Sequence, residues 1–155
     1  KYYFMKYIAL IIMTFFSLTS SLAQKKSSTK EAIYVASKEF LALNLPFSQA
    51  VVYGDVIYVS GQLGSVGLKL VEGGVIPESR QAMMNIKNIL EQHGSSMDNI
   101  IKCTCMLADM KDWPDFNSEY TKFFPNDKPA RSAFGTNGLA LGAKVEIECM
   151  AYIKK

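Results

Sequence analysis

The stretch Lys144-Val145-Glu146-Ile147-Glu148-Cys149 alternates between apolar and charged side chains, and the alternation of faces continues to Ile153. This period of two residues predicts a strand over residues 144–153, because successive side chains of a strand point to opposite faces of its sheet. The apolar face is formed by Val145, Ile147, Cys149, Ala151 and Ile153. The opposite face is formed by Lys144, Glu146, Glu148, Met150 and Tyr152. The apolar face of this strand is therefore expected to cover a core.

A shorter extended run is predicted to begin at Pro129-Ala130-Arg131-Ser132, where Arg131 precedes Glu146 by fifteen residues. If the two runs pair as neighbouring strands, the guanidinium and the carboxylate converge on one small pocket. The planar guanidinium matches a carboxylate ligand, and a nearby carboxylate can accept a proton, so the pair has the chemistry of a site. The other interpretation of this stretch is a surface ion pair that flanks a hairpin.

Two helices are predicted upstream of these runs. The first covers residues 78–93, where apolar side chains recur at helical spacing between Pro77 and Gly94. The second covers residues 112–124, with Asp112 as its N-cap and Pro114 in its first turn. Its apolar stripe is formed by Trp113, Phe116, Tyr120 and Phe123.

Further strands are expected on both sides of the first helix. Residues 50–53 and 56–61 form a predicted hairpin with the two-residue turn Gly54-Asp55. A strand over residues 99–109 places one apolar set on a single face, namely Ile101, Cys103, Cys105 and Leu107. The remaining segments are a short strand, irregular chain and glycine-broken extended chain, expected over residues 32–36, 37–48 and 64–74.

This order of elements predicts an α+β fold in which two helices cover one face of a mostly antiparallel sheet. The opposite face is too apolar for a surface in contact with water. Its predicted members are Val56, Tyr58, Thr104, Met106, Met150 and Tyr152. Burial of this face against other copies of the chain explains the pattern, so a homo-oligomer is expected.

The first part of the chain has the pattern of a secretory signal peptide. Translation is expected to start at Met5, and about ten apolar residues lead to small residues and a cleavage site after Ala23. A membrane anchor is the alternative, but spanning a bilayer takes roughly 20 apolar residues. A periplasmic or secreted protein is therefore expected, with a flexible lead-in over residues 24–31 and one domain over residues 32–155.

The charge and the metal-ligand residue types exclude several classes of function. The formal charge of +3 falls to +1 when residues 1–23, which contain Lys1 and Lys6, are removed. No nucleic-acid partner and no anionic membrane surface is expected at that balance. The three cysteines are interpreted as buried small hydrophobic residues, and the single histidine makes a metal site improbable.

Six short stretches carry a resemblance to a known family. They are Pro46-Phe47-Ser48-Gln49-Ala50, Val59-Ser60-Gly61-Gln62, Gln81-Ala82-Met83-Met84-Asn85-Ile86, Phe116-Asn117-Ser118-Glu119-Tyr120, Pro129-Ala130-Arg131-Ser132 and Val145-Glu146-Ile147-Glu148. By their order and spacing, the chain resembles the RidA/YjgF family of enamine/imine deaminases from about residue 32 to its end. The resemblance implies a chorismate-mutase-like α+β fold assembled as a homotrimer, with pockets at the subunit interfaces and with no metal and no organic cofactor.

The resemblance also implies an activity and its residues. The family hydrolyses reactive 2-imino or 2-enamino acids to 2-keto acids and ammonia, as 2-iminobutanoate/2-iminopropanoate deaminases do. Arg131 matches the arginine that holds the substrate carboxylate, and Glu146 matches the glutamate that positions the attacking water. Ser60, Gly61 and Asn117 match residues that line the same pocket.

Two pocket positions and one nearby loop depart from the family pattern. Phe47 stands where many members carry a tyrosine, Ala133 replaces a frequent cysteine, and Leu139-Ala140 replaces a common Leu-Pro. These changes leave a second hypothesis open, in which the trimer binds small carboxylates without turning them over. An RNA-cleaving activity fits poorly, because the processed chain is nearly neutral and no histidine lies in the matched stretches.

Overall fold

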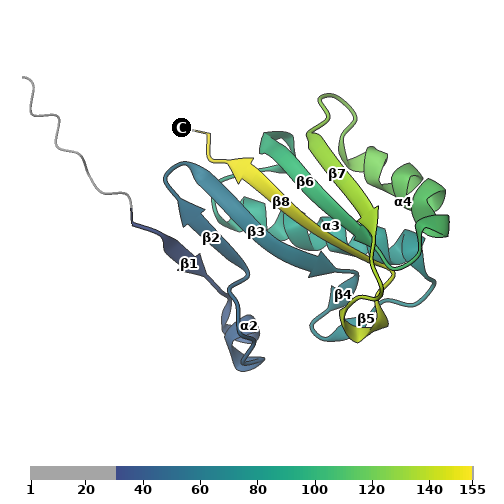
Figure 1. The fold of residues 1–155 in the computed structure, drawn as a ribbon. Helices are drawn as coiled ribbons and strands as arrows, with labels where there is room; N and C mark the ends of the chain where they lie inside the picture. The colour runs from purple at the N-terminus through teal and green to yellow at the C-terminus, as the bar shows by residue number, and fades with distance from the viewer. Residues whose placement is uncertain (1–30, 155) are drawn as a thin grey trace, which may run out of the picture. The chain divides into compact units, whose positions relative to one another are not determined.

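A computed structural model describes residues 31–154 of the chain. The expected signal peptide, and the lead-in up to residue 30, lie outside the described residues. Six strands form one sheet, with the bounds β1 Ile33–Val35, β2 Ala50–Tyr53, β3 Val56–Leu63, β6 Ile100–Leu107, β7 Ala130–Gly135 and β8 Val145–Tyr152. Their order across the sheet is β1-β2-β3-β8-β6-β7, as Figure 1 shows.

The strand predicted from residues 144–153 lies in the middle of this sheet. β8 pairs antiparallel with β3 on one side and with β6 on the other, whereas β6 pairs parallel with β7. The predicted hairpin is confirmed, and Gly54 adopts a φ of 66° in its turn, a left-handed conformation that glycine adopts without steric cost. The sheet is therefore mostly antiparallel, as predicted, with one parallel pair at its edge.

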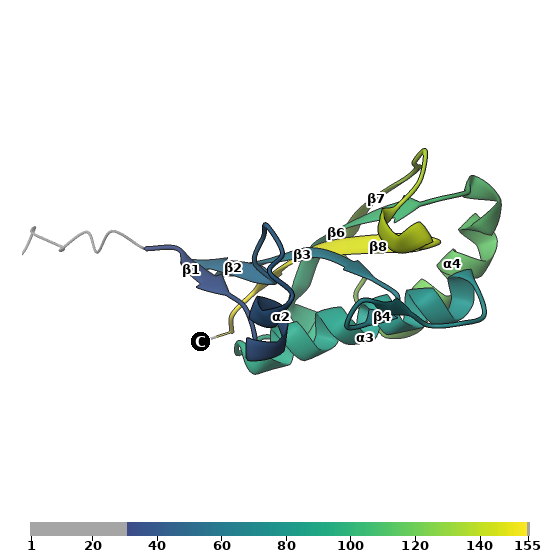
Figure 2. The same cartoon turned by 90° about the horizontal axis from the view of Figure 1, so that it is seen from below.

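Two longer helices pack on one face of the sheet (Figure 2). The helix α3, Val75–Gln92, begins three residues earlier than predicted, so that Pro77 lies in its first turn. The helix α4, Trp113–Tyr120, is followed by a 3-10 turn over Thr121–Phe123. Asp112 is the N-cap residue of this helix, as predicted, but its side chain makes no capping hydrogen bond.

Three short elements refine two predicted segments, because a helix lies in the segment expected to be irregular and a strand pair lies in the segment expected to be extended. Residues 37–48 contain the helix α2, Lys38–Ala42, whose Phe40 N–H donates to the Ser37 hydroxyl at 3.2 Å. A single turn this short leaves no hydrophobic period in the sequence. The glycine-rich segment after β3 forms a small antiparallel pair, β4 Ser65–Val66 with β5 Lys69–Leu70.

A bulge at the start of β6 changes which isoleucine of this strand faces the core. The register with β8 shifts between Ile100 and Lys102, so Ile100 enters the core and Ile101 is 47% exposed. A bulge adds one residue to a strand and thereby reverses the alternation on one side of it. The prediction that Ile101 lies in the core is therefore wrong, whereas Cys103, Cys105 and Leu107 are buried as expected.

The core lies between α3, α4 and one face of the sheet. Its fully buried large side chains include Ile57, Met83, Ile86, Leu90, Leu107, Phe116, Val145 and Ile147. We call the other side of the sheet the open face, because no layer of the described residues covers it (Figure 2). It carries Tyr58, Met150 and Tyr152, each of them exposed by about two fifths of its surface. Within residues 31–154, no helix has the length and apolarity that crossing a membrane requires.

Candidate functional site

Arg131 lies on the edge strand β7 and points toward the helices. Its register partner in β6 is Cys103, which is buried in the core, and paired residues of neighbouring strands point to the same face. The Arg131 side chain therefore extends beneath α4. There its Nη2 donates a hydrogen bond to the Oδ1 atom of Asn117 at 2.9 Å.

Aromatic rings of α4 surround the same guanidinium. The Cζ atom of Arg131 lies 5.1 Å from the ring centroid of Trp113, 4.7 Å from that of Tyr120 and 5.9 Å from that of Phe116. Positions 113, 116–117 and 120 lie one helical turn apart, so a single face of α4 supplies both the rings and the amide. Cation–π contacts and one hydrogen bond thus hold the guanidinium in place. We call Arg131, Asn117 and Ala133 the arginine group.

The guanidinium of Arg131 has no carboxylate partner among the described residues. Arg80 provides the contrast, because its Nε donates to Glu119 Oε1 at 2.7 Å and Lys122 Nζ donates to the other oxygen of that carboxylate at 2.6 Å. Arg80 therefore joins α3 to α4 through a nearly buried glutamate, and Lys122 in the turn after α4 pairs with the same carboxylate. The fork of Arg131 is held by rings and an amide instead, which leaves its charge free to bind an anionic ligand.

Glu146 lies on β8 and points to the open face. Opposite it, the pairing of β3 with β8 is irregular between Val59 and Gln62. Gly61 lies within this irregular stretch, and a methyl group added at Gly61 would overlap the Glu146 carboxylate. The absence of a side chain at Gly61 therefore makes room for that carboxylate.

Ser60 and Phe47 lie next to this place in the chain. The Ser60 hydroxyl donates to the carbonyl oxygen of Ser48 at 2.7 Å, which ties β3 to the loop that carries Phe47. The Phe47 ring is half exposed and packs edge-on against Phe40, with centroids 5.7 Å apart. We call Glu146, Gly61, Ser60 and Phe47 the glutamate group.

The environment of Glu146 changes its acidity. Burial raises the pKa of its carboxyl above the ordinary glutamate value, and the negative charge of Glu148 two residues away raises it further. Both effects disfavour the charged form. A carboxylate of this kind is a better proton acceptor than an exposed one, and it can take a proton from a water molecule held against it.

The two groups do not meet within one chain. The strand β6 separates β7 from β8, so the runs containing Arg131 and Glu146 do not pair as neighbours, and the condition for a pocket within one chain is not met. Arg131 points to the same face as its partner Cys103, and Glu146 points to the same face as its partner Met106. Cys103 and Met106 are three residues apart in β6, and an odd spacing along a strand places two side chains on opposite faces. The two side chains consequently project from opposite faces of the sheet. The interpretation as a surface ion pair between them is also excluded, because the sheet lies between their charges.

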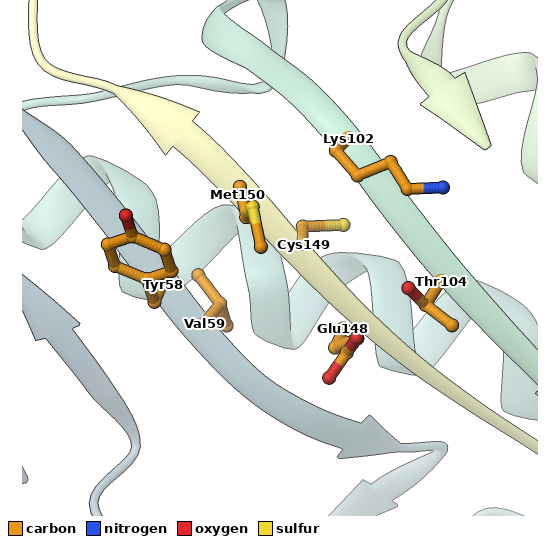
Figure 3. Close-up of a pocket in the computed structure, with 7 residues that line it drawn as sticks. All are labelled: Tyr58, Val59, Lys102, Thr104, Glu148, Cys149 and Met150. Carbon is orange, nitrogen blue, oxygen red and sulfur yellow. The ribbon is translucent and has the colours of Figure 1, made fainter. Parts of the chain in front are cut away.

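The open face has a shallow depression of about 80 Å³. Tyr58 on β3, Met150 on β8 and Lys102 on β6 lie around it, as Figure 3 shows. Lys102 reaches away from it to donate from Nζ to the Ser132 hydroxyl at 2.6 Å. None of the predicted site residues lines this depression, so it is a feature of the uncovered sheet rather than part of either group. Residues 31–154 also contain no cluster of three side chains suited to hold a metal ion.

Sequence reasoning missed the partners of the predicted arginine. Trp113, Phe116 and Tyr120 were interpreted only as the apolar stripe of a helix, and Phe116 and Tyr120 are indeed buried. A stripe of three aromatic residues with an asparagine beside it is also what a helix needs in order to hold a guanidinium. That signal becomes specific only when a strand places an arginine beneath the helix.

These features define an α+β protein in which one helix holds an arginine and the opposite sheet face carries a half-buried carboxylate. The chain belongs to the RidA/YjgF family, since the model described as Endoribonuclease L-PSP matches residues 38–153.

Several proteins of known sequence or structure are similar to it. The 2-iminobutanoate/2-iminopropanoate deaminase of Capra hircus is 43% identical over 108 residues, which cover 68% of this chain and 79% of the relative. Reactive Intermediate Deaminase A, chloroplastic, of Arabidopsis thaliana is 37% identical over 134 residues, which cover 85% of this chain and 71% of the relative. The crystal structure of yeast Mmf1 superposes with a TM-score of 0.72 at 37% identity and covers 80% of this chain and 100% of that one.

Proposed function

We propose that this protein hydrolyses reactive 2-imino and 2-enamino acids to 2-keto acids and ammonia. Arg131 binds the substrate carboxylate, and Glu146 positions the attacking water. Relatives about 40% identical that are named as deaminases of 2-iminobutanoate and 2-iminopropanoate support this class of substrate. The observation that carries the proposal is the guanidinium of Arg131, which α4 holds in place without neutralising its charge.

The reaction needs few groups. The imine carbon lies next to the carboxylate, so a bidentate pair with Arg131 fixes the position of that carbon. Water held by Glu146 gives a proton to the carboxylate as its oxygen bonds to the carbon. The nitrogen takes the proton back from the Glu146 carboxyl and a second proton from the newly added hydroxyl group while the carbon–nitrogen bond breaks, and ammonia and the 2-keto acid leave. Neither step requires an oxidant or a protein nucleophile.

The opposite orientations of Arg131 and Glu146 bear on how the site is built. A substrate only a few atoms long cannot contact both residues of one chain through the sheet. We therefore include in the proposal a homotrimer in which the arginine group of one subunit faces the glutamate group of another. The apolar side chains of the open face support assembly, since such a face is stabilised by burial against a second copy.

A binding protein without turnover is the second candidate. The ring of Phe47 offers no hydroxyl, and the Ser60 hydroxyl is already donated to a backbone carbonyl. Among the four residues of the glutamate group, this leaves Glu146 as the side chain that can transfer a proton. In the binding hypothesis, Arg131 alone explains affinity for small carboxylates, and Glu146 has no chemical role.

A trapping assay tests the proposal. An amino-acid oxidase generates 2-iminobutyrate or 2-iminopropionate in place, and semicarbazide captures the imine that has not hydrolysed. The purified protein is expected to lower semicarbazone formation, and Arg131→Ala is expected to abolish the effect. Arg80→Ala is the matched control, because Arg80 is also a helix-contacting arginine but its charge is paired with Glu119.

Two outcomes count against the deaminase. Unchanged semicarbazone formation by a folded, assembled protein favours the binding hypothesis, which predicts that a 2-keto acid still binds and that Arg131→Ala weakens it. Full activity of Arg131→Ala would show that Arg131 does not bind the substrate and that the site has been assigned wrongly.

A further inference from the structure

Two of the three cysteines face each other across neighbouring strands. Cys103 on β6 and Cys149 on β8 are register partners in the antiparallel pair, and both are buried in the core. Their side chains lie on the helix face of the sheet, although Cys149 also lines the shallow depression of the open face. Neither residue belongs to the arginine group or the glutamate group.

The hydrogen-bond pattern shows which kind of pair they form. Beyond the end of the strands, the Ala108 N–H donates to the carbonyl oxygen of Lys144 at 3.0 Å, which makes Ala108 and Lys144 a hydrogen-bonded pair. Hydrogen-bonded and non-hydrogen-bonded pairs alternate along an antiparallel ladder. The register is regular from Lys102 to Leu107, so Cys103 and Cys149, five steps away, form a non-hydrogen-bonded pair.

Such a pair has the geometry that a disulfide needs. In a non-hydrogen-bonded pair the two Cα atoms are about 4.5 Å apart and the side chains approach closely. A disulfide requires Cα atoms about 4.4–6.8 Å apart. A bond between Cys103 and Cys149 therefore fits the existing ladder without a change in strand register.

The two thiols also influence each other's acidity. The neighbouring Cys149 thiol lowers the pKa of Cys103, and the Cys103 thiol together with burial raises the pKa of Cys149. In Figure 3 the sulfur of Cys149 lies between the ribbons of β8 and β6. In the folded core, Cys103 is therefore the more acidic thiol of the pair.

The third cysteine differs in its partners. Cys105 lies on the same face of β6, but its register partner in β8 is Ile147 and its partner in β7 is Ala133. No thiol lies opposite it. Burial raises the pKa of Cys105 to about 12, so it remains a protonated thiol.

We propose that Cys103 and Cys149 form a cross-strand disulfide when the chain folds in the presence of a small-molecule disulfide, and that Cys105 remains free. The thiolate of one of these two cysteines attacks one sulfur of the reagent and releases one reduced thiol. The other cysteine then attacks the protein sulfur of the mixed disulfide and releases the second, while the two protein protons pass to the released thiolates. The protein pair is oxidised and the reagent is reduced to two thiols. Because both cysteines are buried once folded, the exchange takes place before the core closes.

Refolding of the full chain tests this inference. The reduced, unfolded protein is refolded with oxidised and reduced glutathione, blocked with an alkylating reagent in denaturant and weighed by mass spectrometry. We expect one alkylated cysteine instead of the three of the reduced protein. Cleavage into peptides and fragmentation between Cys103 and Cys105 should assign the bond to Cys103 and Cys149.

Variants separate this bond from other thiol chemistry. Cys105→Ala should keep the bond and leave no free thiol, whereas Cys149→Ala should leave both remaining cysteines alkylated. Three alkylated cysteines in natively folded protein, a glutathione adduct alone, or a bond that includes Cys105 would each overturn the inference. The assignment by fragmentation uses the unsubstituted chain, so the test holds even if a core variant fails to fold. It involves no enzyme assay and is independent of the proposed activity.

Discussion

Gly61 and Glu146 lie so close together that only a hydrogen atom fits between the Gly61 backbone and the carboxylate. A small change at Gly61 therefore acts on Glu146 without removing it. We expect Gly61→Ala to push the carboxylate aside while the fold persists, because the overlapping atoms end a side chain that can rotate. A catalytic group misplaced by about 1 Å can cost roughly 100-fold in rate.

Turnover in the imine-trapping assay and thermal unfolding measure the two effects of Gly61→Ala separately. Gly67→Ala is a control for the loss of a glycine, since a methyl group there meets no atom within contact distance, although the positive φ of Gly67 costs stability. Wild-type turnover by Gly61→Ala would show that the position of Glu146 does not matter for the reaction.

Replacement of Arg131 tests the binding role. Arg131→Ala removes one partner of a charge pair with the ligand, which typically costs about 2–5 kcal/mol, so affinity for a 2-keto acid should fall by roughly 30-fold or more. Arg131→Lys keeps the charge but loses the planar fork, and we expect an intermediate loss. Calorimetric titration measures both. Equal affinities for the lysine variant and the wild type would mean that charge alone binds the ligand.

The raised pKa of Glu146 predicts the pH dependence of the reaction. The carboxylate form is needed to take a proton from water, so activity is lost as the pH falls through the Glu146 pKa, which lies above the ordinary glutamate value. Glu148→Gln removes a like charge, lowers that pKa and should move the acid limb of the rate profile to lower pH. Glu91→Gln, on the exposed side of α3, should leave the limb in place. An unchanged rate profile for Glu148→Gln would show that the acid limb does not come from the titration of Glu146.

Mixing two inactive variants tests whether different subunits supply the two groups. If each site takes Arg131 from one subunit and Glu146 from another, some sites in a mixture of Arg131→Ala and Glu146→Gln subunits contain both native residues. Random reassembly of equal amounts in a symmetric oligomer should restore about one quarter of the sites. Activity is measured before and after the subunits are dissociated and reassembled together. No recovery after confirmed subunit exchange would mean that one chain supplies both residues.

Much of the fold follows from the periodicity of the chain. The alternation of residues 144–153 and the helical spacing before Gly94 both report burial on one side of an element, and both elements are present. The bulge at Ile100 and the short helix α2 were not predictable in this way. A bulge depends on the pairing with β8, and the capping of α2 by Ser37 involves too few residues to create a period.

The extended conformation at Arg131 and Glu146 was predictable, but the arrangement of the two residues was not. Spacing places Arg131 and Glu146 on extended segments, and both are on strands. That β6 lies between those strands depends on contacts distant in sequence, so a local pattern contains no trace of it. The contact between Arg131 and the aromatic rings of α4 was also not predictable from a local pattern, because it depends on the parallel pairing of β6 with β7.

The connection from β6 through α4 to β7 has a consequence for how the protein folds. Arg131 and its partner Asn117 are separated by 14 residues, and both belong to this one continuous segment. Glu146 and Gly61, in contrast, are in contact although 85 residues separate them in the chain. Closing a short loop costs less chain entropy than closing a long one, and local contacts speed folding. The guanidinium should therefore reach its native surroundings early on the folding pathway, and the carboxylate should be among the last groups to be put in place.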